Sequence, residues 1–384
     1  MTRAARFPLV DALRAVAAMA ILGFHGAAVY DGFALEHAGR WLAQLQVGVP
    51  LFFAISGFLL YRPWVAARLD GRAPPSVRIY ALRRALRIVP AYWLALVVIT
   101  LVTGRAGVLV WPDGLVYFGF AQAYSQETFT GGIGQAWTLT VEVAFYVALP
   151  LLALAVRQVR RAGRDLAGEV VLLVGLAALS VAWRILVLGV ADYGDAAYFP
   201  LVSALPAQLD MFAAGMALAV LSAAGAGRGV VAVVARRPWL PWAGAAAAYA
   251  ALVLWEPGEV ALVLVEHELQ LLVAVGLLLP AVLGTEGGGW PRRLLAWRPL
   301  AWAGLVSYGL YLWHLDVLRE VEGAGLPGPV AFLAGAAISF ALAAASWYGV
   351  ERRALRVGRR AAHREPVDPQ PARPVPTTAE TAGP

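Results

Sequence analysis

PLVDALRAVAAMAILGFHGAAVY, residues 8–30, is an apolar run long enough to cross a bilayer as a helix, since a span needs about 20 such residues. Similar runs recur along the 384-residue chain, which is 60% hydrophobic and 14% charged, with a mean hydropathy of +0.68. Soluble domains usually carry about 25% charged residues. A membrane span must satisfy its own backbone, and the alternation of a β-barrel is absent, so the spans are helices. We therefore predict an all-α, polytopic membrane protein.

About ten spans are expected, at residues 8–30, 45–61, 85–103, 138–157, 169–190, 203–224, 239–256, 262–284, 299–320 and 327–350. The apolar segment 113–124 is too short to cross, and we expect it at the interface or as a re-entrant turn. Residues 1–357 form one predicted transmembrane domain. The Arg-, Pro- and Thr-rich segment 358–384 has the composition of a disordered cytoplasmic tail.

The distribution of arginine predicts the orientation. If the N-terminus is inside, 26 of the 31 arginines fall in inside segments and three in outside loops. Cytoplasmic loops carry such an excess, so we predict that both termini are cytoplasmic and that the protein lies in the cytoplasmic membrane. The net charge of +7 is then a sign of topology and gives no reason to expect a nucleic-acid partner. Asp11, Arg14 and His25 in the first span argue against a cleaved signal peptide.

An ionisable side chain inside the membrane costs about 2.5–3.5 kcal/mol and needs an explanation. The predicted spans hold Asp11, Arg14, His25, Glu142, Arg184, Asp210, His314 and Asp316. Arg14 and His25 are eleven residues apart and return to nearly the same helix face, whereas Asp11 lies within pairing distance of Arg14.

Some of these residues have plain structural explanations. Arg184 and Asp210 can form a buried structural ion pair. Asp316 lies near a helix end, where exposure to water would explain it. His314 can be a hydrogen-bonded packing residue.

The predicted topology also assigns depths. It places His25, Glu142 and His314 in an outer polar layer, and Arg14 and Ser56 in an inner layer near the basic segment 62–87. The chain has no cysteine, which excludes disulfides and thiolate chemistry. It shows no nucleophile elbow, phosphate-binding loop, dinucleotide fingerprint or metal-ligand cluster, so we expect no metal and no tightly bound cofactor.

Five motifs, in order, resemble those of the acyltransferase-3 family of membrane O-acyltransferases. The first is residues 7–27 with Asp11, Arg14 and His25, and the second is GVPLFFAISGFL at 48–59 with Ser56. The third is RRALRIVPAYW at 83–93 with Arg83, Arg84 and Arg87. The last two are WTLTVEVAFY at 137–146 and SYGLYLWH at 307–314. The main departures are Pro50 in the second motif and the absence of an appended hydrolase-like domain.

The resemblance implies transfer of an acyl group, usually acetyl, from cytoplasmic acyl-CoA to an acceptor hydroxyl. It implies that His25 is a general base or a transient acyl carrier, with Glu142, Arg14 and Asp11 as its catalytic neighbours. Arg83, Arg84 and Arg87 would bind the phosphates of CoA. The remaining substrate-binding candidates are Ser56, Trp137, Thr138, Tyr146, Tyr311 and His314.

The acceptor stays open at this stage: a sugar, a surface polysaccharide, a glycolipid or a glycosylated natural product. If one site serves both substrates, the acceptor would approach from outside. The alternative function is a proton-coupled secondary transporter or permease, in which the intramembrane Asp, Arg and His residues would form a proton relay. Matching halves with broken helices, which many transporters have, are not visible in the sequence. A sensor or scaffold is disfavoured by the short loops.

Overall fold

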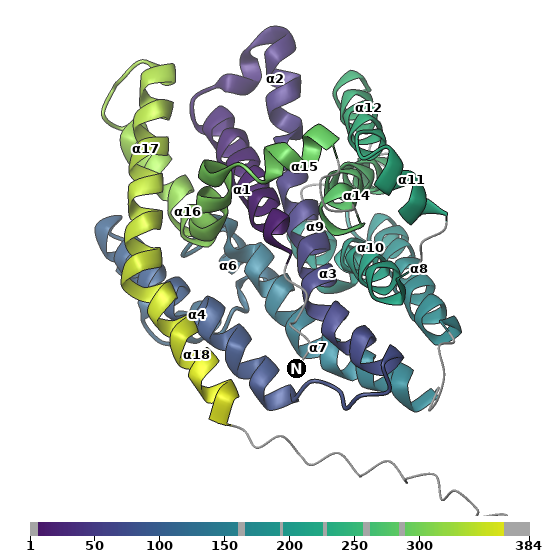
Figure 1. Cartoon of the computed structure of the whole chain (residues 1–384). Coiled ribbons are helices and arrows are strands. Elements are labelled where there is room, and N and C mark those ends of the chain that lie inside the picture. Colours follow the sequence, from purple (N-terminus) through teal and green to yellow (C-terminus); the bar gives the residue numbers. More distant parts are fainter. Residues whose placement is uncertain are drawn as a thin grey trace, which may run out of the picture.

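The chain is a bundle of long helices, as the computed structural model shows (Figure 1). The structure describes residues 7–159, 166–192, 195–225, 229–255, 262–283 and 289–364. No β-strand occurs among these residues. Many apolar side chains on the outward faces are exposed, for example Val171, Val174 and Leu333, as expected for helices that face lipid. The prediction of an all-α, polytopic membrane protein is confirmed.

The long helices are α1 (Pro8–Val29), α3 (Gly48–Leu69), α4 (Val77–Val102), α7 (Trp137–Val159), α8 (Ala167–Val190), α10 (Leu205–Ala224), α12 (Leu240–Leu254), α14 (His267–Leu283), α16 (Arg298–Glu322), α17 (Gly328–Ser346) and α18 (Arg352–Arg364). The short helices are α2 (Glu36–Ala43), α5 (Asp113–Phe118), α6 (Gln126–Phe129), α9 (Tyr198–Ser203), α11 (Val230–Arg236) and α15 (Gly289–Leu295).

Within the described residues, eight helical stretches are long and apolar enough to cross a membrane, by length and composition. They are Leu9–Val29, His37–Leu69, Val77–Val102, Gly134–Arg157, Ala167–Val190, Tyr198–Ala224, Val263–Leu283 and Gly328–Ala361. The other two predicted spans also correspond to helices, but α12 has only 15 residues. In α16, polar, aromatic and charged residues together lower the hydropathy. A count of ten crossings therefore stays a prediction, as does the position of the termini.

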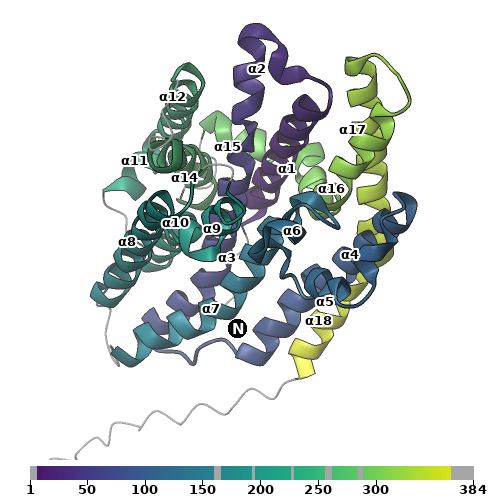
Figure 2. The same cartoon turned by 180° about the vertical axis from the view of Figure 1, so that it is seen from behind.

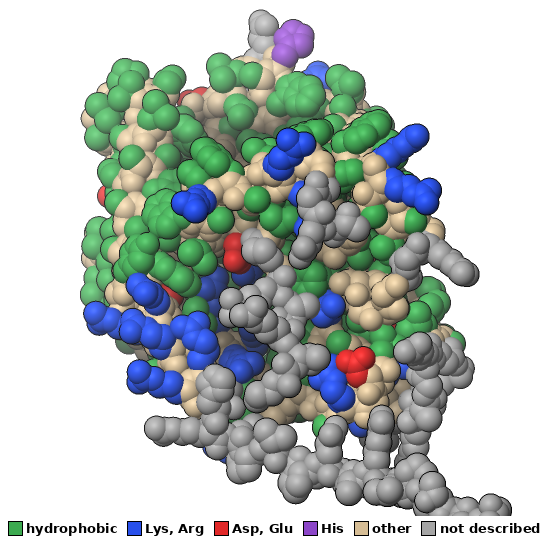
Figure 3. Space-filling model, viewed as in Figure 1, with side chains coloured by type: hydrophobic (Ala, Val, Ile, Leu, Met, Phe, Trp, Pro, Cys, Tyr) green, Lys and Arg blue, Asp and Glu red, His purple; other side chains and the backbone are tan. Residues whose placement is uncertain are grey.

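The C-terminal helix extends further than the composition indicated. A π-helical turn, Trp347–Glu351, joins α17 to α18, which continues to Arg364, seven residues into the predicted tail. The rest of that tail lies outside the described residues. Helix α18 packs against α4, and both carry exposed arginines, including Arg83 and Arg356. Basic side chains gather where these helices meet, at the lower left of Figure 3.

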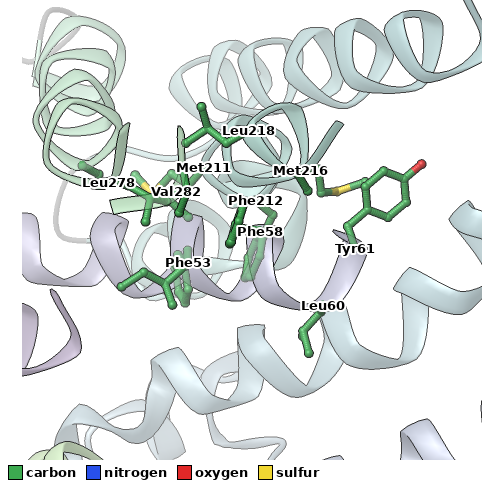
Figure 4. Close-up of a cluster of buried hydrophobic side chains, with 14 of the residues drawn as sticks. Phe53, Phe58, Leu60, Tyr61, Met211, Phe212, Met216, Leu218, Leu278 and Val282 are labelled. Atoms are coloured by element: carbon green, nitrogen blue, oxygen red, sulfur yellow. The ribbon is translucent and has the colours of Figure 1, made fainter. Parts of the chain in front are cut away.

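The core lies where α3 packs against α10, with α14 on one side (Figure 4). Phe212 of α10 stacks between Phe53 of α3, at a centroid distance of 4.7 Å, and Phe145 of α7, at 3.9 Å. Elsewhere α1 packs along α16, and α16 along α17 (Figure 2). A common interior lies between α1, α3, α4, α7 and α16, and polar side chains of these helices project into it.

Two glycines allow the close approach of α3 and α10. A Cβ atom on Gly57 would lie 2.2 Å from the carbonyl oxygen of Phe212, and one on Gly215 would lie 1.9 Å from that of Ala54. Membrane helices that pack closely commonly use small residues at their contacts in this way. Gly57, one of the two glycines in the second sequence motif, therefore has a structural explanation.

Gly215→Val is expected to destabilise the protein by on the order of 3 kcal/mol, because the helices must separate to admit the side chain. The matched control is Gly175→Val in α8, where an added Cβ meets no atom within 4 Å. The measurement is the temperature at which detergent-purified protein stops eluting as a single species. If this temperature is the same for the two variants, the close contact between α3 and α10 does not have the role given to it.

Candidate active site

A narrow cavity of about 80 Å³, here called the arginine pocket, lies inside the bundle. Residues of α1, α3, α4, α7 and α16 line it, so it depends on five helices that are distant in the sequence. The polar and charged residues in its lining are Arg14, Ser56, Arg84, Arg87, Thr138, Glu142, Tyr146, Ser307, Tyr308 and Tyr311. Eight of these were predicted as site residues from the sequence.

Glu142 is held firmly in the arginine pocket. Its Oε1 accepts hydrogen bonds from the hydroxyls of Ser56, at 2.5 Å, and Tyr146, at 2.6 Å. Arg14 lines the same cavity and pairs with Asp11 at 3.2 Å, as the three-residue spacing predicted. Asp11 itself does not line the cavity, and its contact with the site is the ion pair with Arg14.

The three predicted phosphate-binding arginines have different surroundings. Arg87 lies 3.7 Å from Glu351 and over the rings of Tyr308 and Trp347. Arg84 lines the arginine pocket, and its buried Nε has no hydrogen-bond partner. Arg83 is exposed and lines a neighbouring cavity instead. Arg84 is thus a cation with a donor still to satisfy, which suits an anionic ligand.

A second cavity of about 180 Å³, here called the histidine pocket, holds His25. Its lining includes Trp137 and Thr138 from the sequence prediction. It also includes polar residues that the sequence analysis did not identify, namely Gln46, Gln135, Gln208, His267 and Gln270. The sequence carried a signal for one of them, because Glu266, His267 and Glu268 all lie within the predicted span 262–284.

His314 lies behind His25 and is 1% exposed. Its Nδ1 is 3.0 Å from the carbonyl oxygen of Leu310 and 2.9 Å from that of Tyr311, and its Nε2 is 2.7 Å from Nδ1 of His25. Carbonyl oxygens can only accept, so His314 Nδ1 carries the proton and, in a neutral ring, its Nε2 accepts. His25 Nδ1 is then the donor to His314. The unprotonated nitrogen of His25 is Nε2, which is the state that a general base requires.

The two pockets meet at a wall formed by Val49, Thr138 and Tyr311, which line both. The hydroxyls of Thr138 and Tyr311 are 2.5 Å apart, and the Tyr311 hydroxyl also donates to the carbonyl oxygen of Gln135 at 2.5 Å. A ligand group that extends from the arginines to His25 must therefore pass this hydrogen-bonded pair.

The structure changes the predicted polar layers in one respect. Glu142 was expected beside His25 and His314, but it lines the arginine pocket with Ser56 and Arg14. The depth of a residue, when estimated from the ends of a predicted span, is uncertain by about one helical turn, roughly 5.4 Å. Thr138, which lines both pockets, and Glu142, which lines only the arginine pocket, are about one turn apart along α7.

Two further interpretations concern residues away from the pockets. The interpretation of Arg184 and Asp210 as a buried ion pair is confirmed, at 2.6 Å, and His267 lies 3.0 Å from the same carboxylate. The interpretation of Asp316 as exposed to water is wrong. Its side chain is 5% exposed and forms an ion pair with Arg105.

Comparison with known proteins identifies the family. A family model described as an acyltransferase domain matches residues 7–348. The chain belongs to the acyltransferase-3 family. This acyltransferase therefore contains all five motifs within one family domain, and the resemblance noted in the sequence is confirmed. The alternative of a transporter is not retained.

Relatives of this acyltransferase differ in name and length. It is 32% identical to Nodulation protein 10 of Rhizobium leguminosarum bv. viciae, over 33% of this chain and 38% of the relative. It is 28% identical to Acyltransferase MdmB of Streptomyces mycarofaciens, over 41% of this chain and 42% of the relative. It is 23% identical to Peptidoglycan O-acetyltransferase OatA of Listeria monocytogenes serovar 1/2a, over 81% of this chain and 49% of the relative. The chain spans less than half the length of each of these relatives. No solved structure matches.

Proposed function

We propose that this acyltransferase moves an acyl group, in the first instance acetyl, from acyl-CoA to a hydroxyl of a sugar, a surface polysaccharide, a glycolipid or a glycosylated natural product. The observation that carries the proposal is the meeting of a cationic cavity and an imidazole cavity at one shared wall. Such an arrangement can hold an anionic donor on one side and activate a hydroxyl on the other.

The donor side of the proposal is supported by the arginine pocket. Arg84 presents an unpartnered donor, Arg14 and Arg87 add positive charge, and the wall of α3 supplies the apolar side chains of Phe52, Ile55 and Leu59. A pantetheine arm has this character, since it is a thin chain that follows charged phosphates. The arginines lie on the side that the sequence predicts to be cytoplasmic, where acyl-CoA is made.

The chemistry follows from the His25–His314 pair. His25 Nε2 takes the proton from the acceptor hydroxyl as its oxygen forms a bond to the thioester carbonyl carbon. The C–S bond then breaks, and the departing thiolate of CoA takes the proton from His25. A nearby donor must stabilise the oxyanion that forms in between. Thr138 and Tyr311, in the shared wall, carry the two hydroxyls that line both cavities.

The acceptor side of the proposal is supported by the lining of the histidine pocket. Four glutamine amides and a tryptophan ring suit a neutral, polyhydroxylated ligand, which needs many hydrogen bonds and an apolar face. The name of the Listeria relative, a peptidoglycan O-acetyltransferase, favours a glycan of the cell envelope.

The deciding experiment uses purified protein in liposomes with acetyl-CoA and a panel of glycan acceptors. The chain has no cysteine, so a thiol reagent reports released CoA without background from the protein. Mass spectrometry then identifies the acceptor that gains an acetyl group. Acetylation that proceeds from a different donor, with no thiol release from any acyl-CoA, would overturn the proposed donor.

Arg84→Gln is expected to raise the KM for acetyl-CoA about 10-fold or more, because it removes a charge-assisted hydrogen bond of about 1.5–3 kcal/mol. The matched control is Arg356→Gln on α18, which is exposed and lines none of the three cavities described here. The difference in KM between wild type and variant should shrink at high salt, since screening weakens the attraction between Arg84 and the phosphates in the wild-type enzyme. An unchanged KM would move the phosphates away from Arg84.

A further inference from the structure

The glutamine side chains that line the histidine pocket have their amide nitrogens bound within the protein. Gln46 Nε2 and Gln270 Nε2 each donate to Oε1 of Glu266 at 3.0 Å. Gln208 Nε2 donates to the carbonyl oxygen of Val202, also at 3.0 Å. Carboxylate and carbonyl oxygens only accept, so none of these amides can turn round without placing oxygen against oxygen. The part of each amide that is left for a ligand is its carbonyl oxygen.

Gln135, in the wall of the same pocket, has the same arrangement. Its Nε2 donates to two backbone carbonyl oxygens, that of Tyr311 at 2.8 Å and that of Leu312 at 3.0 Å. Its Oε1 is buried, and no group among the described residues donates to it. A buried amide oxygen without a donor lowers stability, and native proteins keep few of them. The wall of the pocket therefore has too few donors for its acceptors.

The histidines of the pocket have the same polarity. His267 Nε2 lies 3.0 Å from a carboxylate oxygen of Asp210, which is ion-paired with Arg184. A carboxylate only accepts, so Nε2 carries the proton and, in a neutral ring, the other nitrogen of His267 accepts. His25 Nε2 is unprotonated as well. Among the lining side chains only the indole of Trp137 is restricted to donating, so accepting groups dominate the pocket.

We propose that the histidine pocket selects its acceptor by hydrogen-bond donors: it binds a sugar through the hydrogens of several free hydroxyl groups, which donate to the glutamine oxygens. Glu266 does not line the pocket, and it acts as a positioning residue that holds the amides of Gln46 and Gln270 with their oxygens toward the ligand. An anionic sugar, or one already acylated at these hydroxyls, brings further acceptor atoms and is excluded. This inference rests on the proposed function, because it assumes a saccharide acceptor.

The first test uses the wild-type protein, so it does not depend on the folding of a variant. The probe is the smallest sugar of the acceptor panel that gains an acetyl group, together with derivatives that carry hydrogen or fluorine in place of one other hydroxyl. Replacing a recognised hydroxyl by hydrogen is expected to raise the KM for the acceptor about 2- to 12-fold, as for the loss of one neutral hydrogen bond. Fluorine cannot donate, so the deoxyfluoro sugar should bind no better than the deoxy sugar.

Two results would overturn the proposed polarity. One is a deoxyfluoro sugar whose KM returns toward that of the parent sugar, since a group in the pocket would then be donating to the fluorine. The other is a full set of deoxy sugars that keep the KM of the parent. If no sugar of the panel gains an acetyl group, the proposed function fails instead, before any derivative is made.

The second test removes the group that fixes two of the amides. Glu266→Gln keeps the size of the side chain but can both donate and accept, so the amides of Gln46 and Gln270 become free to turn. The variant is expected to raise the KM for the parent sugar about 2- to 12-fold, with kcat and the KM for acetyl-CoA unchanged. The ratio of the KM of the deoxy sugar to that of the parent should fall toward one at the hydroxyls that these two amides bind.

This ratio separates positioning from a merely structural role, because a loss of packing would lower stability or kcat without changing it. The matched control is Glu127→Gln on α6, an exposed site that lines neither pocket, and it should change neither the KM nor the ratio. A well-folded Glu266→Gln protein with the wild-type KM and the wild-type ratio would overturn the role of Glu266.

Discussion

His25→Ala is expected to lower the rate of acyl transfer about 10²- to 10⁴-fold, the usual contribution of a positioned general base. The reason is geometric. His25 is the half-buried imidazole of the histidine pocket whose Nδ1 is bound to His314, which leaves Nε2 toward an acceptor. The measurement is kcat from thiol release at saturating acetyl-CoA and acceptor.

Two controls make the result specific. His37→Ala removes an exposed histidine on α2 and should leave kcat unchanged. Added imidazole should restore part of the activity of His25→Ala, because it can enter the space left in the cavity. A well-folded His25→Ala protein with wild-type kcat would remove the base from this position.

The same residue has a second possible role, that of a transient acyl carrier. In that case acetyl-CoA alone, without an acceptor, should release one thiol per enzyme in a rapid first phase. A general base should give no such phase. Single-turnover thiol release by the wild-type protein therefore separates the two roles.

His314→Phe is expected to lower kcat on the order of 10- to 100-fold, the range known for groups that orient metal-binding histidines. Phenylalanine keeps the packing but cannot accept the hydrogen bond from His25 Nδ1, which lies 2.7 Å from His314 Nε2. The ring of His25 would then be free to rotate or to change tautomer. The KM for acetyl-CoA should not change, since His314 lines none of the three cavities.

A purely structural role for His314 would give a different result. In that case His314→Gln, which can accept through its side-chain oxygen, should be no better than His314→Phe. If His314 orients His25, the glutamine variant should recover a large part of kcat. The pH dependence of kcat should also shift in the phenylalanine variant, because the partner of the titrating imidazole is lost.

Several features of this protein follow from its sequence. Each predicted span corresponds to a helix. The spans could be predicted because an apolar run of about 20 residues is long enough for a helix to cross a membrane. The Asp11–Arg14 pair follows from a spacing of three within one helix. The motif residues that line the arginine pocket were also identifiable, since ionisable and hydroxyl groups are conspicuous in apolar runs.

Only the tertiary structure decided which of these side chains meet. His25 contacts His314, which is 289 positions away in the sequence. Glu142 accepts a hydrogen bond from Ser56 and does not lie with the histidines, and Asp316 forms an ion pair with Arg105. The glutamines and His267 converge on one cavity from several helices. Periodicity within a helix fixes its length and its polar face. The rotation and axial shift of one helix against another depend on packing, here on contacts as close as that of Gly215 with Ala54, and no local pattern encodes them.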